Sequence, residues 1–336
     1  MTKQPGSTIA VLGAGSWGTA LAIALAKNKF AINLWDRNPQ HIEQLSTTGI
    51  NQRYIPDITL PTLITPLADL GTAINNTQYI LVATPSHGFR ELLRNIKKAS
   101  NNYRIVWASK GLEPGTGKFL HEIAAEELDA GILTATVSGP SFALEVARSL
   151  PTAMTVASLD NAFAKQIAST LHCQNLRTYT STDIIGVELG GAVKNVLAIA
   201  AGIADGLGFG ANTRAALITR GLAEMMRLGE ALDGRQETFM GLTGVGDLIL
   251  TCTDDQSRNR RLGLALGQGD DLDTAISNIG QAVEGVHTAR EVACLAQKHG
   301  IEMPIVEQVD KVLNQNQSPA AAVKALLTRD PKAEVF

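Results

Sequence analysis

The sequence predicts an α/β N-terminal half built on a doubly wound, mostly parallel sheet, followed by an all-α C-terminal half. From Thr8 to about Tyr179, short apolar runs alternate with helical patterns, as is typical of parallel strands joined by crossover helices. These runs are rich in Val, Ile, Leu and Ala without strict alternation, as expected for strands covered on both faces. After about Thr182 the strand signals stop and long Ala-, Leu-, Ile- and Gly-rich segments follow.

The order of the elements follows from these runs. The predicted strands are TIAVLG, AINLWD, YILVAT, RIVWAS, LTATVS and AMTVAS. The predicted helices of the second half cover 183–204, 212–232, 258–268, 271–278, 285–299, 304–313 and 318–328. A chain of 336 residues has room for about two domains. We therefore predict a first domain over 1–185 and a second over 186–336.

Composition limits the classes of partner and the compartment. The net charge of -3 gives no sign of the basic surface that DNA, RNA or an anionic membrane would attract. The N-terminus holds no apolar signal segment, and the most apolar stretch is interrupted by Glu188, Lys194 and Asn195, so we expect no membrane span. We expect a cytoplasmic protein. Three widely spaced cysteines are expected to be buried thiols in a reducing compartment: Cys173, Cys252 and Cys294.

A G-x-G-x-x-G motif joins the first strand to an apolar helix. Gly13 allows a tight turn, Gly15 lets the backbone approach a pyrophosphate, and Gly18 lets helix and strand pack closely, with the phosphates at the helix N-terminus. The alternative is a tight strand-to-helix turn without a ligand. The flanking strand and helix favour a Rossmann-like domain that binds a dinucleotide.

Residues at the end of the second strand give opposite signals about the cofactor. Asp36 could accept a hydrogen bond from a ribose 2′-hydroxyl, which favours NAD, whereas Arg37 could pair with a 2′-phosphate, which favours NADP. Either residue could equally be a solvated turn charge. The preference stays open.

The segment DIIGVELGGAVKNVLAIAAGIADG is apolar nearly all round, a pattern typical of a buried central helix. It carries Lys194. Burial disfavours the ammonium form and lowers the pKa of a lysine, which makes Lys194 a candidate general base. The alternative is a lysine whose head group reaches water past a packed stem.

A second polar cluster lies in GLTGVGDLILTCTDDQSRNRR. Asp247 follows a Gly-rich turn, and Ser257, Arg258 and Asn259 are expected to start a helix. A guanidinium with hydroxyl and amide donors at a helix start suits the capture of a phosphate monoester. The alternative is a basic, solvated helix face opposite two nearby aspartates.

Further candidates follow two predicted strands, at the sheet edge where ligands bind. They are Lys110 after one strand and Gly139 and Ser141 after the next. The six histidines form no metal-ligand pair, so we assign them no role and expect no metal site.

Together these blocks resemble the bacterial NAD(P)-dependent glycerol-3-phosphate dehydrogenases. The resemblance runs from about residue 8 to 310. It rests on VLGAGSWGTALA, LW-x-R-x-P, VATPSH, WASKGLEPGTG, SGPSFA-x-E, ELGGAVKNV, GLTGVGDLILTCT, SRNRR-x-G, EGVHTA and above all the long block GFGANTRAALITRGLAEM.

The resemblance implies reversible reduction of dihydroxyacetone phosphate to sn-glycerol 3-phosphate by hydride transfer from NAD(P)H, which supplies glycerophospholipid synthesis. Lys194 would be the proton acceptor. The substrate residues would be Lys110, Gly139, Ser141, Lys194, Asp247, Ser257, Arg258 and Asn259. The cofactor residues would be Gly13, Gly15, Ser16, Trp17, Gly18, Arg37, Lys110, Ala143, Arg258, Ala282 and Glu284. Relatives often have another aromatic at Trp17, Thr at Ser141 and a larger aliphatic residue at Ala282.

Two rival functions share parts of this pattern. Dehydrogenases of the β-hydroxyacid or ketopantoate type also join a dinucleotide half to a helical half with an active lysine, but their substrates are carboxylates. A non-catalytic dinucleotide sensor would need the Gly-rich motif without Lys194 or Asp247. We also expect a homodimer, because apolar helices of the second half can pair about a two-fold axis.

Overall fold

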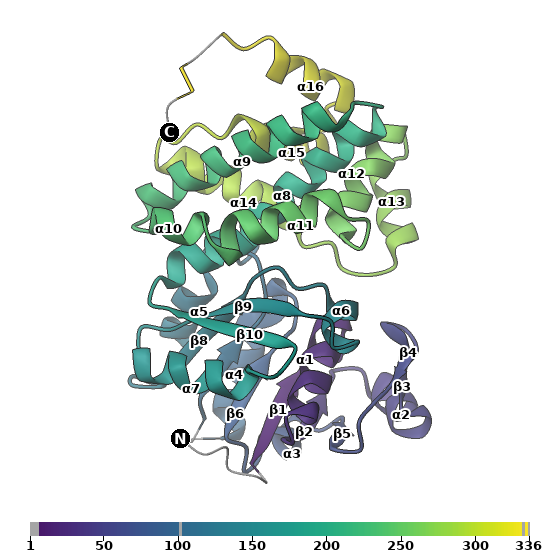
Figure 1. Ribbon diagram of the computed structural model, residues 1–336, viewed down its shortest axis with the longest axis vertical. Coiled ribbons are helices and arrows are strands. Elements are labelled where there is room, and N and C mark those ends of the chain that lie inside the picture. The colour runs from purple at the N-terminus through teal and green to yellow at the C-terminus, as the bar shows by residue number, and fades with distance from the viewer. Residues whose placement is uncertain (1–6, 101–102, 331–332, 335–336) are drawn as a thin grey trace. The chain divides into compact units, whose positions relative to one another are not determined.

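The computed structural model describes residues 7–100, 103–330 and 333–334 (Figure 1). The chain forms two compact units. One comprises Met1–Ser109 with His121–Ile184, and the other Lys110–Leu120 with Ile185–Phe336. The short segment 110–120 therefore packs with the helical unit, whereas the single predicted boundary placed it in the first domain.

The first unit is built on an eight-stranded sheet with the order β10-β9-β8-β7-β6-β1-β2-β5. All pairs in it are parallel except β8 with β9. The six predicted runs are all strands, which confirms the fold class, whereas β5 and β10 were not predicted. The strands are β1 (Thr8–Leu12), β2 (Ala31–Trp35), β5 (Ile64–Leu67), β6 (Tyr79–Val82), β7 (Ile105–Trp107), β8 (Thr134–Ser138), β9 (Thr152–Ala157) and β10 (Leu176–Ser181).

Helices and a small hairpin complete this unit. Asn38 accepts hydrogen bonds from the main-chain N–H groups of Gln40 and His41 at the start of α2, and Gly49 ends that helix in the left-handed conformation. The hairpin is β3 (Ile50–Asn51) with β4 (Ile55–Thr59). The helices are α1 (Ser16–Lys27), α2 (Pro39–Thr48), α3 (Leu70–Ile74), η1 (Ser86–Gly88), α4 (Phe89–Ala99), α5 (Leu120–Glu127), α6 (Ala143–Ala147) and α7 (Asn161–Leu171).

The second unit is helical, and its core surrounds α8 (Ile184–Gly206). Among the described residues, only α8 is long and apolar enough to span a membrane, and 94% of its apolar window is buried inside the fold. All seven predicted segments are helices, whereas α10, η2 and α11 were not predicted. The other helices are α9 (Ala211–Ala231), α10 (Gln236–Phe239), the π-helix η2 (Leu242–Gly246), α11 (Asp247–Thr253), α12 (Arg258–Gln268), α13 (Leu272–Ile279), α14 (Gly285–Lys298), α15 (Pro304–Asn314) and α16 (Pro319–Leu327).

Glycines bring the backbones of α8 and α12 into contact. A Cβ on Gly202 would lie 2.1 Å from the carbonyl oxygen of Arg260, and one on Gly263 would lie 2.1 Å from that of Ile199. Any larger residue at either position would push the helices apart. This contact fixes the N-terminus of α12 beside the middle of α8.

The cysteine prediction is partly wrong. Cys252 is buried, but Cys173 is half-buried and Cys294 is exposed. Cys294 lies on α14. A lone thiol is small enough to be tolerated on a helix surface as well as in a core.

Candidate functional site

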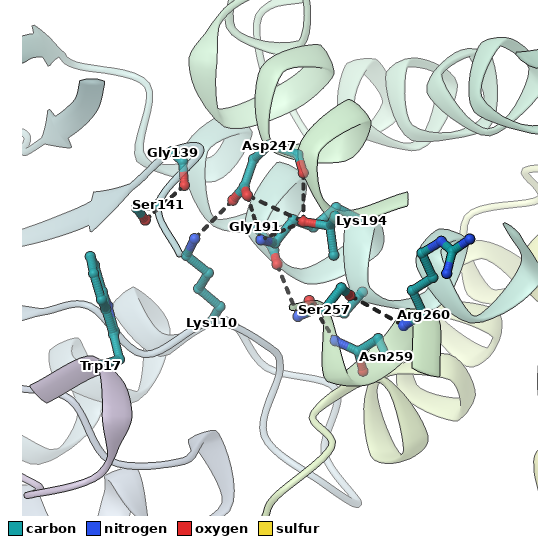
Figure 2. Close-up of polar contacts among 12 residues, drawn as sticks. Trp17, Lys110, Gly139, Ser141, Gly191, Lys194, Asp247, Ser257, Asn259 and Arg260 are labelled. Atoms are coloured by element: carbon teal, nitrogen blue, oxygen red, sulfur yellow. Dashed lines mark hydrogen bonds and ion pairs between the residues drawn. The ribbon is translucent and has the colours of Figure 1, made fainter. Parts of the chain in front are cut away.

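Two lysines share one buried aspartate in the helical unit (Figure 2). Asp247 is 1% exposed; its Oδ1 accepts from Lys194 Nζ at 2.5 Å and its Oδ2 from Lys110 Nζ at 2.8 Å. Lys194 Nζ also donates to the hydroxyl of Thr251 at 3.1 Å, and that hydroxyl donates to the main-chain carbonyl of Asp247 at 2.6 Å. Lys194 is only 7% exposed, so its head group does not reach bulk water.

A π-turn aims Asp247 at α8. In η2, a Cβ on Gly244 would lie 1.9 Å from the carbonyl oxygen of Phe239, so only glycine fits the wide turn. On α8, a Cβ on Gly190 would lie 2.4 Å from the carbonyl oxygen of Thr243, so this glycine lets the turn approach the helix backbone. Asp247 is the first residue of α11 and faces Lys194, one helical turn beyond Gly190. π-turns inside helices are frequent at functional sites.

The charges of this cluster change the proton affinities of its members. Burial lowers the pKa of Lys194 to about 7; the nearby Asp247 carboxylate opposes that shift, and the positive charge of Lys110 adds to it. Burial alone would raise the pKa of Asp247, but Lys110 and Lys194 outweigh it, so the pKa lies below its ordinary value. The cluster therefore holds an ionised carboxylate beside an amine that exchanges its proton near neutrality.

The start of α12 carries the second set of predicted residues. Ser257 caps the helix, accepting from the Arg260 N–H at 3.2 Å, and a hydroxyl in this role can still donate its own hydrogen. Asn259 Nδ2 donates to Asn195 Oδ1 at 2.9 Å, which links α12 to the residue next to Lys194. Arg258 is the first residue of α12, and its Nη1 lies 3.5 Å from Gln281 Oε1.

The neighbouring arginine has a structural role. Arg260 is 8% exposed and pairs with Asp205 at 2.6 Å and with Asp255. A basic, solvated helix face is therefore the wrong description at this position. The buried ion pair instead anchors the helix start that presents Arg258 and Asn259.

The start of α14 adds the residues Ala282 and Glu284. Glu284 precedes the first residue of the helix, Gly285, whose N–H donates to Asn259 Oδ1 at 2.9 Å. A Cβ on Gly285 would lie 2.6 Å from that same amide oxygen. Asn259 thus holds the chain next to Glu284 as well as Asn195.

Sequence reasoning missed Asn195 and Thr251 as members of this site. Asn195 lies next to Lys194 and reaches Asn259. Thr251 lies four residues after Asp247, a spacing that brings two side chains together on a helix. This spacing indicates a contact between the two side chains only if the segment is known to be helical, and α11 was not predicted.

The Gly-rich loop of the sheet unit has the shape of a phosphate cradle. Gly13 has φ +112°, and a Cβ there would lie 3.0 Å from the main chain of Ala83. A Cβ on Gly18 would lie 1.9 Å from the carbonyl oxygen of Gly13, whereas around Gly15 it would meet nothing within 4 Å. The N-cap residue of α1 is Gly15, which has no side chain to occupy the space in front of the helix. Loop and helix start therefore fit a pyrophosphate.

The other predicted cofactor residues of this unit lie near the loop or the sheet edge. Trp17 Nε1 donates to the carbonyl oxygen of Ala108, at the end of β7, at 3.2 Å. Arg37 is exposed after β2, whereas Asp36 accepts from the N–H groups of Ala14 and Asn38, each at 3.0 Å. Both oxygens of Asp36 are thus engaged by the backbone.

Gly139, Ser141 and Ala143 follow β8 in the same unit. Gly139 has φ +140°, and a Cβ there would lie 3.1 Å from the main chain of β9, so glycine is required. Ser141 donates to the carbonyl oxygen of Gly139 at 3.0 Å, and Ala143 begins α6. The turn places Gly139 and Ser141 directly after the carboxyl end of β8.

Comparison with known proteins identifies the family. The model for the NAD-dependent glycerol-3-phosphate dehydrogenase N-terminus matches residues 8–164, and the model for its C-terminus matches residues 183–324. The chain belongs to the NAD-dependent glycerol-3-phosphate dehydrogenase family. The resemblance stated from the sequence motifs is confirmed.

Individual relatives match over their whole length. The chain is 54% identical over 335 residues to a glycerol-3-phosphate dehydrogenase [NAD(P)+] of Thioalkalivibrio sulfidiphilus, covering 99% of this chain and 100% of the relative. It is 53% identical to the enzyme of the same name from Pseudoalteromonas translucida, covering 98% of each. The crystal structure of glycerol-3-phosphate dehydrogenase from Coxiella burnetii superposes with a TM-score of 0.94 at 47% identity, covering 97% of this chain and 100% of that one. The chain is therefore an oxidoreductase of this family rather than of the β-hydroxyacid or ketopantoate type.

Proposed function

We propose that the chain reversibly reduces dihydroxyacetone phosphate to sn-glycerol 3-phosphate with NADH or NADPH, and so supplies glycerophospholipid synthesis. One observation carries the proposal within this family. A buried amine, Lys194, lies 2.5 Å from an ionised carboxylate and has a pKa of about 7. An amine with that proton affinity both accepts and returns a proton at neutral pH.

Lys194 is the proposed acid and base. The nicotinamide, when bound, supplies or accepts the hydride. In the oxidising direction, Lys194 takes the proton of the C2 hydroxyl, and in the reducing direction it returns a proton to the carbonyl oxygen. Asp247 orients the amine, and Thr251 holds a second side of it, so the nitrogen is fixed before substrate arrives.

The remaining predicted residues bind the two ligands. The substrate phosphate is a dianion, and the cationic groups Arg258 and Lys110 balance it, while the donors of Ser257 and Asn259 orient it. Gly139 and Ser141 complete the proposed substrate set. The cofactor set comprises Gly13, Gly15, Ser16, Trp17, Gly18, Arg37, Lys110, Ala143, Arg258, Ala282 and Glu284. We assign residues 1–185 to cofactor binding and 186–336 to substrate binding and catalysis.

Location and assembly follow the same proposal. We propose a cytoplasmic homodimer with a small phosphate ester as substrate and no nucleic-acid partner. The near-neutral charge of -3 supports the last point. A monomeric mass in solution would refute the dimer.

The pH dependence of kcat/KM should run in opposite directions for the two reactions. Oxidation requires neutral Lys194, so its kcat/KM rises with pH and levels off above about 7. Reduction requires the ammonium form, so its kcat/KM is highest below about 7 and falls above it. Initial rates from about pH 5 to about pH 9 measure both profiles. Two profiles that bend in the same direction would exclude Lys194 as the shared acid and base.

An absorbance assay of the purified protein tests the reaction itself. Dihydroxyacetone phosphate is offered with NADPH and with NADH, and unphosphorylated dihydroxyacetone is the control. We expect rapid loss of reduced cofactor with the phosphate ester alone, because unphosphorylated dihydroxyacetone carries no negative charge for Arg258 and Lys110 to bind. Cofactor binding without turnover would redirect the search to hydroxy and oxo acids.

A further inference from the structure

The peptide groups on both sides of Ala14, in the middle of the Gly-rich loop, are held by side chains from outside the motif. The Ala14 N–H donates to Asp36 Oδ2 at 3.0 Å. The Ala14 carbonyl oxygen accepts from Asn51 Nδ2 at 2.9 Å, from His41 Nε2 at 3.2 Å and from Thr19 Oγ1 at 3.3 Å. Because a carbonyl oxygen only accepts, Nε2 of His41 carries the proton in this contact.

These bonds fix the direction of the next N–H group. In a trans peptide the C=O and N–H bonds point in opposite directions. Three donors on the Ala14 oxygen therefore turn the Gly15 N–H away from the protein interior. A Cβ on Gly15 would meet nothing within 4 Å, so there is open space beside this residue.

Asn51 is unusual among these donors. It is fully buried, and its Nδ2 donates to Thr19 Oγ1 at 2.8 Å as well as to Ala14. Its Oδ1 has no hydrogen-bond partner within the described structure. A buried amide oxygen without a partner costs free energy, so an amide at this position is poorly explained by stability alone. Its two hydrogen bonds, to Ala14 and to Thr19, go to the loop and to the helix that follows the loop.

We propose that Asn51 and His41 are positioning residues for the cofactor: from β3 and α2 they hold the Ala14 carbonyl inward so that the Gly15 N–H faces the dinucleotide pyrophosphate. Neither residue belongs to the Gly-rich motif, and neither needs to touch the cofactor. The inference rests on the proposed function only in taking a nicotinamide dinucleotide as the ligand.

The test measures the dissociation constant of NADPH and of NADH by fluorescence titration, without substrate. Asn51→Ala should raise both constants about tenfold, the effect of losing one well-formed hydrogen bond to a preorganised loop. At saturating cofactor, kcat and the KM for dihydroxyacetone phosphate should stay within about twofold, because the cluster around Lys194 is unchanged. A purely structural role would lower the melting temperature without this selective loss of cofactor affinity.

Asn33→Ala is the matched control. Asn33 lies on β2 in the same unit, and its Nδ2 donates to the carbonyl oxygen of Ala73 at 2.8 Å, away from the loop. The control should lower the melting temperature and leave cofactor affinity unchanged. The proposal would be overturned if the cofactor dissociation constants rose equally in both variants, or if they were unchanged in Asn51→Ala.

His41→Phe keeps the test decisive if Asn51→Ala does not fold. Phenylalanine retains a ring at the edge of Tyr54, whose centroid lies 5.5 Å from that of His41, but removes the Nε2 donor. We expect a severalfold rise in both dissociation constants with a folded protein. An unchanged constant in this variant would also overturn the proposal. Because cofactor binding is measured alone, failure of the dihydroxyacetone phosphate reaction would leave the inference standing.

Discussion

Replacing Lys194 by methionine should lower kcat/KM for dihydroxyacetone phosphate by about 10²- to 10⁴-fold, the range of general acid and base catalysis. This corresponds to about 3 to 5 kcal/mol of transition-state free energy. Methionine keeps most of the volume of the buried stem and removes only the amine that contacts Asp247 and Thr251. Steady-state kinetics in both directions measure the loss.

Two comparisons separate chemistry from folding in this experiment. The dissociation constant of NADPH should be unchanged, because no residue of the Gly-rich loop is altered. Lys298→Met, in the last turn of α14, removes an exposed lysine from the same unit and should leave kcat/KM unchanged. Turnover close to normal in Lys194→Met would remove this lysine from the mechanism.

The regular elements were predictable because burial governs their sequences. The six predicted strands are rich in Val, Ile, Leu and Ala, and the central helix α8 is apolar nearly all round. β5 and β10 were missed because ITPL is short and interrupted by proline, and LRTYTS carries alternating polar residues. Edge strands lack the apolar run of central ones.

The parts of the site that were missed depend on contacts between distant segments. GLTGVGD has the composition of a turn, yet it forms a π-helix because Gly244 avoids the carbonyl of Phe239 and Gly190 admits the turn to α8. Without α11, the spacing of Thr251 from Asp247 carried no signal. His41 was given no role, since its contact with Ala14 depends on where α2 lies beside the Gly-rich loop.

Lys194 and Asp247 could be proposed separately from sequence, but their relation could not. Each residue follows from a local pattern: a lysine in an apolar helix and an aspartate after a Gly-rich turn. Only the fold shows that one carboxylate serves two lysines, with Lys110 at 2.8 Å on its other oxygen. Burial is the main cause of the lowered pKa of Lys194, and the positive charge of Lys110, which shares the carboxylate, lowers it further.

Asp247→Asn tests that relation and should impair both catalysis and stability. Asparagine has the same shape but no charge, so Lys194 loses its counter-ion and its pKa falls further below about 7. We expect kcat to fall about 10²-fold, because the amine is no longer held in one orientation. The base limb of the oxidation profile should also move to lower pH.

The stability loss in Asp247→Asn should depend on pH with a definite sign. The pKa of Lys194 is depressed in the folded protein, so the unfolded chain binds the extra proton between that pKa and the ordinary value of 10.5. In the variant, the pKa of Lys194 in the folded protein is lower still. Holding its ammonium form in the folded protein therefore costs additional folding free energy below about pH 7 and none above it. We expect a loss of about 3 kcal/mol near pH 6 and a smaller one near pH 9, where only the ion pair between Asp247 and Lys110 is lost.

Asp255→Asn provides the matched comparison for this last experiment. Asp255 also pairs with a cation of the helical unit, Arg260, but its side chain is 72% exposed, so its ion pair contributes little to stability. Urea unfolding at the two pH values should show a small, pH-independent change in this variant. An Asp247→Asn protein with normal kcat and an equal loss of stability at both pH values would mean that Asp247 neither orients Lys194 nor compensates its charge. The buried carboxylate would then stabilise the turn between η2 and α11, and the proton affinity of Lys194 would be set by burial alone.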